Sequence, residues 1–412
     1  MQVDRADPQT YLAQALTSPQ LPDELKPFYH AFERFYANRR VRRATPCTVA
    51  GATRSLHCAV DPRRLWFQLT RSIEAFFAVP SSAPFRIDLY DSFIRDFASK
   101  LDQLKLASIA VSVARTYADG TQAVQFLDAL LPQLDTPDSR EAFVLVRMER
   151  GHFQLLLGET EDAKEAMDQC EKILDALDSV DLAVHASFYR VSGDYWKAKA
   201  EFADYYKNSL LYLACIDVST DLTPEERVSR ANDLGISALL GTIYNFGELL
   251  MHPILDSLVG TDREFIRNLL FAFNAGDIPK FQALVPEMGA KEPFLQQHFA
   301  FLREKICLLA LIEAVFKRPT ADRVLPFSII SSEAQVPVDE VEHLVMKALA
   351  LKLIRGTLDQ VSSTATISWV QPRVLDRPQI DALRERLTEW TDKVQAQGDF
   401  ARAAAPELFA QA

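Results

Sequence analysis

Residue types that can act as nucleophiles or metal ligands are scattered along this 412-residue sequence. The seven histidines form neither an HExxH nor an HxH motif, and no two cysteines form a CxxC pair. Zinc sites and disulfide frameworks depend on such spacings. We therefore expect no metal site, and free thiols in a reducing compartment. The five cysteines are Cys47, Cys58, Cys170, Cys215 and Cys307.

Phosphate-binding and nucleophile motifs are also missing from the sequence. It contains neither GxxxxGK(S/T) nor GxGxxG, the glycine-rich loops that hold nucleotide phosphates. A near match to the GxSxG nucleophile turn begins at Gly235, but Leu239 replaces its second glycine and the surrounding pattern is helical. Ser237 is therefore expected to be a small residue at a helix contact. We predict no catalytic residue, no cofactor-binding residue and no enzymatic activity.

Two clusters of carboxylates lie where helices are predicted to begin. In LTPEERV, Thr223 is placed as an N-cap, Pro224 as the first helical residue and Glu226 as the reciprocal partner of a capping box. DTPDSREAF is predicted to repeat this arrangement at Thr136. These carboxylates are expected to cap helices rather than to transfer protons.

Composition indicates a globular protein without a broad phosphate-binding surface. Hydrophobic residues make up 48% of the chain, enough for two or three structural units, and the formal net charge is −11. Affinity for a nucleic-acid backbone requires clustered Lys and Arg. No apolar run reaches the roughly 18 residues that a membrane helix needs, and the N-terminus lacks the apolar core of a signal peptide. We expect a cytoplasmic and nuclear protein.

Helical periodicity dominates residues 104–311, where apolar residues recur at intervals of three and four. The predicted helices are separated by short breaks, three of which contain a glycine suited to a left-handed C-cap: Gly120, Gly158 and Gly276. A fourth break, at AEFADYY, has no glycine. Helical hairpins of this length must stack to bury their apolar faces. We predict a mainly α, right-handed helical-repeat solenoid of the tetratricopeptide type; a closed helical bundle is the alternative.

A different pattern follows the predicted solenoid, in residues 316–376. A short strand at VLPFS and a short helix at FSIISSEAQ precede a second helix that starts after Pro337. LIRGTLDQV and TATISWVQ are then predicted to pair as two strands. Strand, helix, helix and hairpin, in this order, predict a winged helix that caps the solenoid.

The charge of the predicted winged helix argues against nucleic-acid binding. Its second helix would have to present basic or amide side chains to the major groove, but it begins with Asp339, Glu340 and Glu342. Trp369, on the predicted hairpin, is expected to be a core or interface aromatic rather than a platform for a base. We therefore predict that this winged helix packs against protein.

The C-terminal segment, 377–412, contains a predicted partner-binding helix in PQIDALRERLTEWTDKVQAQ. Its apolar residues are spaced by three, four, three and four, the narrow stripe typical of a bundle helix. We predict that this stripe binds partner helices; packing back onto the chain's own domain is the alternative. The stripe consists of Ile380, Leu383, Leu387, Trp390 and Val394.

A helical solenoid capped by a winged helix resembles the PCI-domain proteins. YNFGELLMHPILDSL, LLFAFNAGDIPKFQAL, EVEHLVMKALALKLIRGTLDQV and WVQPRVLD resemble the non-ATPase regulatory subunit 13 family of the 26S proteasome lid. The resemblance implies a non-catalytic structural and assembly subunit in ubiquitin-dependent protein degradation. It also implies contacts with other lid subunits through the winged helix and the C-terminal helix, and no nucleic acid, membrane or small-molecule substrate. A PCI subunit of another complex, such as the signalosome, and a winged-helix nucleic-acid binder remain as alternatives.

The predicted domain boundaries isolate one unusual segment, residues 39–64, which holds seven arginines and one acid, Asp61. It could be a basic interaction segment, a disordered insertion, or retained non-coding sequence; we predict the disordered insertion because it has few apolar groups to offset ordering entropy. The predicted parts are an N-terminal helical segment (1–38), this insertion (39–64), the solenoid (65–315), the winged helix (316–376) and the C-terminal helix and tail (377–412).

Deletion of residues 39–64 is therefore expected to change the free energy of unfolding by less than about 1 kcal/mol, the scale of an ordinary surface change. Thermal denaturation of the deleted and parent chains measures this difference. A larger loss would show that the segment is part of the folded core.

Overall fold

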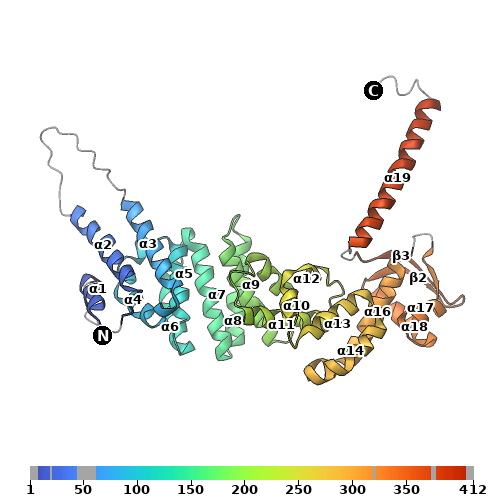
Figure 1. Ribbon diagram of the computed structural model, residues 1–412, viewed down its shortest axis with the longest axis horizontal. Coiled ribbons are helices and arrows are strands. Elements are labelled where there is room, and N and C mark those ends of the chain that lie inside the picture. The colour runs from blue at the N-terminus through green and yellow to red at the C-terminus, as the bar shows by residue number, and fades with distance from the viewer. Residues whose placement is uncertain (1–7, 19–20, 44–61, 319–321, 373–376, 405–412) are drawn as a thin grey trace. The chain divides into compact units, whose positions relative to one another are not determined.

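The computed structural model describes residues 8–18, 21–43, 62–318, 322–372 and 377–404 (Figure 1). They form two compact units, Met1–Asp217 and Val218–Ala412. Helices dominate both units, and the three strands among the described residues all lie in the second. This confirms the predicted mainly α fold.

The N-terminal unit contains ten α-helices in its described part. Four 3-10 helices join some of them: η1 (Pro80–Phe85), η2 (Ile94–Asp96), η3 (Ala98–Lys100) and η4 (Pro137–Ser139). The α-helices are α1 (Pro8–Thr17), α2 (Lys26–Arg43), α3 (Pro62–Ala78), α4 (Arg86–Ser92), α5 (Gln103–Ala114), α6 (Gly120–Leu134), α7 (Arg140–Leu157), α8 (Thr160–Asp175), α9 (Leu182–Ala198) and α10 (Phe202–Cys215).

Helices α5 to α10 stack as helical repeats (Figure 1). Helix α7 packs against its chain neighbours α6 and α8 and also against α5 and α9, the helices two positions away. Buried apolar residues line these contacts, such as Val146 against α5 and α6 and Val144 against α8 and α9. Each hairpin therefore completes its core with the next one, as the sequence predicts.

The turns between repeats match the predictions at two of the three glycines. Gly158 ends α7 with a φ of 90°, and Gly276 ends α13 with a φ of 64°. The prediction for Gly120 is wrong: this residue is the first of α6, whose N-cap is Asp119, and α5 has already ended at Ala114. At the fourth break Ala200 takes the left-handed conformation, with a φ of 59°.

The predicted capping boxes have opposite outcomes. At Thr223 the box forms, because the threonine hydroxyl accepts from the Glu226 backbone N–H and the Glu226 carboxylate accepts from the Thr223 N–H. At Thr136 the prediction is wrong: no backbone N–H is capped, and only the short helix η4 follows before α7 begins. Ser139 occupies the third position there, and its hydroxyl lies 2.6 Å from the Leu134 carbonyl oxygen instead.

A buried carboxylate joins three repeat helices. Glu149 of α7 is fully buried and accepts from Arg115, which follows α5, at 2.7 and 3.0 Å, and from Arg190 of α9 at 2.5 Å. Burial alone would raise the pKa of Glu149, but the hydrogen bonds and charges of the two arginines outweigh it and hold the pKa below its usual value. The carboxylate therefore fixes how α5, α7 and α9 stack.

Glu149→Gln is expected to lower the free energy of unfolding by about 2 kcal/mol, because an amide cannot accept both charge-assisted pairs. The pH dependence has a definite sign. A carboxyl whose pKa is lowered by folding stabilises the protein above its unfolded pKa, near 4.5, and loses this contribution as the pH falls through the folded value. Urea denaturation from pH 7 to pH 3 should therefore show the difference between parent and variant shrinking on acidification; a constant difference would contradict this account.

The C-terminal unit continues with helices and ends in a three-stranded sheet. Its elements are α11 (Pro224–Leu240), α12 (Gly247–Met251), η5 (Pro253–Leu258), α13 (Glu264–Ala275), α14 (Ile278–Lys291), α15 (Pro293–Gln297), α16 (Phe299–Phe316), β1 (Val324–Pro326), α17 (Phe327–Ala334), α18 (Val338–Ala350), β2 (Ile354–Asp359), β3 (Thr364–Val370) and α19 (Arg377–Ala404).

The predicted winged helix is present. Its antiparallel sheet has the order β1-β3-β2, with Val324 paired to Thr366 and Ile354 paired to Val370. Helix α17 contacts α16, β1 and α18, and α16 also contacts β3. The winged helix is therefore packed directly on the last long helix of the repeats.

A buried lysine holds the carboxyl end of α11 against α16. Lys305 of α16 is 1% exposed, and its ammonium donates to the carbonyl oxygens of Ala238, Leu239 and Gly241 at 2.7, 3.0 and 2.6 Å. Burial lowers the pKa of Lys305 to about 7, but three carbonyl acceptors and the negative end of the helix dipole favour the ammonium form. The rings of Tyr244, Phe246 and Phe301 also lie 5.1 to 5.9 Å from this nitrogen.

The segment 39–64 is only partly covered by the described residues. Helix α2 extends to Arg43 and α3 begins at Pro62, so residues 39–43 and 62–64, at the two ends of the segment itself, are helical. Residues 44–61, which carry most of the prediction, lie outside the described residues. The predicted boundary between solenoid and winged helix, at 315, falls at the end of α16.

Candidate protein-interaction site

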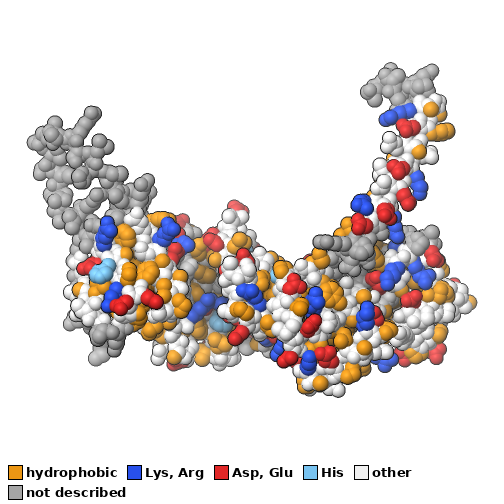
Figure 2. Space-filling view, in the orientation of Figure 1, with side chains coloured by type: hydrophobic (Ala, Val, Ile, Leu, Met, Phe, Trp, Pro, Cys, Tyr) orange, Lys and Arg blue, Asp and Glu red, His pale blue; other side chains and the backbone are white. Residues whose placement is uncertain are grey.

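The predicted partner-binding stripe lies on α19, the longest described helix. We name it the α19 seam; it consists of Ile380, Leu383, Leu387, Trp390 and Val394. Helix α19 has 28 residues, more than the predicted segment, and its five seam residues are between 45% and 64% exposed. They are therefore exposed in the described chain, and Figure 2 shows hydrophobic and charged side chains along this helix. Apolar side chains at this spacing pack against another helix in coiled coils and bundles, so partner binding by the α19 seam stays a prediction.

Phe400 is a large exposed residue of α19 that the sequence prediction omitted; it is 71% exposed. It is six residues beyond Val394, which at about 100° per residue places it outside the seam. The seam spacing of three and four would continue at Gln397 and Ala401. The large apolar side chains of the seam therefore end at Val394.

The acidic start of α18 is exposed, as the charge argument requires. Asp339 and Glu340 lie in its first turn and are exposed. Lys347, further along α18, forms an ion pair with Glu304 of α16, so this cation is engaged within the domain. The second helix of the winged helix thus presents carboxylates where a DNA reader needs donors.

Trp369, on β3, is partly buried. The guanidinium carbon of Arg355, on β2, lies 4.7 Å from its ring centroid. This cation covers one face of the ring. Trp369 is therefore an aromatic of the wing held by its neighbouring strand.

We expect the winged-helix domain, residues 316–374, not to bind duplex or single-stranded DNA at physiological salt, because its second helix, α18, begins with carboxylates. A gel-shift titration with both forms of DNA measures this. Micromolar binding that weakens steeply with added salt would overturn the expectation.

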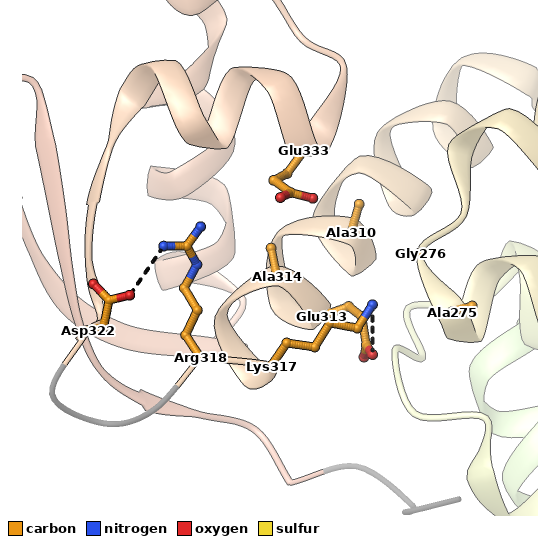
Figure 3. A pocket seen from close by; sticks show the side chains of 9 residues that line it. All are labelled: Ala275, Gly276, Ala310, Glu313, Ala314, Lys317, Arg318, Asp322 and Glu333. Atoms are coloured by element: carbon orange, nitrogen blue, oxygen red, sulfur yellow. Dashed lines mark ion pairs between the residues drawn. The ribbon is translucent and has the colours of Figure 1, made fainter. Parts of the chain in front are cut away.

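A polar cavity of about 470 Å³ lies beside α16 in the C-terminal unit (Figure 3). Its charged side chains are largely matched with one another: Lys317 with Glu313 at 3.6 Å and Arg318 with Asp322 at 3.7 Å. Glu333 of α17 lies across from them. Among the described residues the lining contains no Cys, His or Ser, and it holds three carboxylates, including Glu333, against two cations. The described lining therefore offers no nucleophilic hydroxyl or thiol.

Ser237 and Cys170, two residue types that can act as nucleophiles, are both buried in helices. Ser237 is buried inside α11 and donates to the Leu234 carbonyl oxygen at 2.9 Å. Burial raises the pKa of the Cys170 thiol to about 12, so it is not a reactive thiolate. In the described part of the chain no group of three His, Cys, Asp or Glu side chains could hold a metal ion. The helices in that part include none long and apolar enough to span a membrane.

Helical repeats that lead directly into a winged helix place this chain in the class of PCI-domain proteins. The PCI domain family matches residues 289–369, and the family of PSD13 N-terminal repeats matches residues 60–270. The chain belongs to the 26S proteasome non-ATPase regulatory subunit 13 family, which confirms the resemblance found in the sequence.

Three relatives support this assignment along most of the chain. The 26S proteasome non-ATPase regulatory subunit 13 homolog A of Arabidopsis thaliana is 42% identical over 84% of this chain and 92% of its own. The probable 26S proteasome regulatory subunit rpn9 of Schizosaccharomyces pombe is 40% identical over 81% and 86%. The 26S proteasome regulatory subunit RPN9 of Saccharomyces cerevisiae is 40% identical over 81% and 88%.

Proposed function

We propose that this protein is a non-catalytic structural and assembly subunit of the 26S proteasome lid and contributes to ubiquitin-dependent protein degradation in the cytoplasm and nucleus. The observation that carries the proposal is the identity of about 40% to proteasome regulatory subunits along more than four fifths of the chain.

The proposal assigns two contact surfaces to the C-terminal unit. The winged helix meets neighbouring subunits, and the α19 seam enters a bundle of helices from several subunits. The support for the seam is its exposure: five apolar side chains on one stripe remain accessible in the described chain and need a partner to leave water. The support for a protein contact at the winged helix is the acidic first turn of α18, which favours a protein partner over nucleic acid.

Affinity purification of the tagged chain from cells tests the proposal. We expect proteasome lid and base subunits in amounts comparable to the tagged chain after stringent washing. Recovery of the subunits of another PCI complex, without proteasome subunits, would contradict it and favour the signalosome alternative. Measurement of proteasomal peptidase activity in the eluate adds a second, independent readout.

A further inference from the structure

Charged side chains along α19 are sorted by face. In the heptad notation set by the α19 seam, the seam residues occupy positions a and d, and positions e and g border them. From Ile380 to Val394, every charged residue at e or g is a cation: Arg384, Arg386 and Lys393. All three are exposed.

The acids of α19 occupy the other positions. They all fall at b, c or f, away from the edges of the seam: Asp381, Glu385, Glu389, Asp392 and Asp399. The nearly balanced charge of the helix therefore hides a strong asymmetry. An apolar stripe is bordered by positive charge on both sides, and negative charge lies behind it.

We propose that the α19 seam docks an α-helix of another subunit whose own apolar seam is bordered by Asp or Glu. This inference rests on the proposed function and adds the chemistry of the partner. Charges at e and g positions pair across the interface of two helices and decide which partners associate. The contact runs from Ile380 to Val394, roughly 21 Å at about 1.5 Å per residue.

A second copy of this chain does not satisfy the same requirement. It would bring the same apolar stripe but, between Ile380 and Val394, only cations and neutral residues to the edges, in either relative direction of the helices. No attractive pair across the interface would form. The seam therefore selects against self-association while remaining apolar enough to bind.

The basic edges are accessible to a partner. Arg384 has 72% of its side chain exposed, and its pair with Asp381, at 3.5 Å on the same helix, is a surface ion pair. Such pairs contribute little and are readily exchanged for a pair with an incoming helix. Desolvation at the edge of an apolar seam strengthens the new pair relative to the old one.

Two synthetic helical probes test the proposal against the full chain. Both carry the same Ile and Leu residues at a and d; one has Glu at every e and g position and Lys at b, c and f, and the other has these charges exchanged. Fluorescence anisotropy at roughly 50 mM salt should show the Glu-bordered probe binding at least about tenfold tighter. The preference should shrink at roughly 500 mM salt, where screening is short-ranged.

Matched variants of the full chain assign the preference to the edges. The triple variant Arg384→Glu, Arg386→Glu, Lys393→Glu should prefer the Lys-bordered probe. The control Glu385→Lys, Asp392→Lys changes charge only behind the seam and should keep the parental preference.

Equal binding of the two probes, tighter binding of the Lys-bordered probe, or binding of neither would overturn the inference. A homodimer of the parent chain that the triple variant abolishes would do the same. These outcomes are separable from a failure of the proposed function, which is judged by recovery of proteasome subunits with the tagged parent chain. If that recovery succeeds while both probes bind equally, only the chemistry assigned to the partner is wrong.

Discussion

Lys305→Met is expected to lower the free energy of unfolding of the C-terminal unit by about 3 kcal/mol. The substitution keeps a long unbranched side chain but removes the donor to three buried carbonyl oxygens, on Ala238, Leu239 and Gly241. A buried acceptor left without a partner costs about 1–3 kcal/mol. Relief of the desolvation of the ammonium offsets part of this loss, which is why the expected value is below the sum of three orphaned acceptors.

Native-state hydrogen exchange of the α11 and α16 amides measures this effect directly, because a chain with two compact units does not guarantee a two-state transition. Lys317→Met is the matched control, since Lys317 follows α16 and has 68% of its side chain exposed. It should change protection by less than about 0.5 kcal/mol. Unchanged or increased protection in Lys305→Met would show that burial of the ammonium costs more than its bonds contribute.

Local signals in the sequence predict much of this fold. Helical periodicity, the capping box at Thr223 and the left-handed glycines at Gly158 and Gly276 each depend on residues within one or two turns, and the structure contains them. The winged helix follows from the order of its elements. The two wrong predictions, at Gly120 and Thr136, concern residues that are compatible with more than one local arrangement.

Contacts between distant residues could not be predicted in the same way. Lys305 and Ala238 are 67 residues apart, and Arg115 and Glu149 are 34 apart. Neither pair has a periodic or motif signature, because each is selected by the way that helices stack. Helix α16 also carries Arg303, Glu304 and Glu313, so a Lys in it is not unusual by itself. The available signal was the spacing of Lys305, which lies three residues after Leu302 and four before Leu309 on the apolar face of the helix. A cation on such a face implies a buried acceptor nearby.

For the candidate site, the sequence predicts the apolar seam, and the structure adds that its residues are exposed. Exposure decides what a substitution there should do. Leu387→Asp together with Trp390→Asp is expected to leave the isolated chain soluble, with near-parental thermal stability, because these side chains are 56% and 64% exposed and support no described core. The same double variant should fail to enter the proteasome lid.

We expect this loss of assembly because the double variant replaces two side chains that gain free energy on burial with two that lose it. Transfer of Leu387 or Trp390 into a helix bundle contributes on the order of 2 kcal/mol each, and central interface residues can exceed this. Two aspartates instead bring carboxylates that resist burial without partners. The combined change spans several kcal/mol, roughly a thousandfold or more in affinity. Co-purification of the tagged variant with lid subunits, quantified against the parent, measures it.

Thr388→Asp with Ala396→Asp is the matched control, because it adds the same two carboxylates to α19 outside the seam. It should assemble as the parent does, which separates loss of the apolar seam from added charge or weakened helix formation. Normal assembly of the Leu387, Trp390 variant would show that the seam is not a partner-binding surface. Unfolding of that variant in isolation would show instead that α19 packs on its own domain. Three results together would show that the α19 seam binds another subunit. The Leu387, Trp390 variant fails to assemble, it keeps its thermal stability in isolation, and the Thr388, Ala396 control assembles normally.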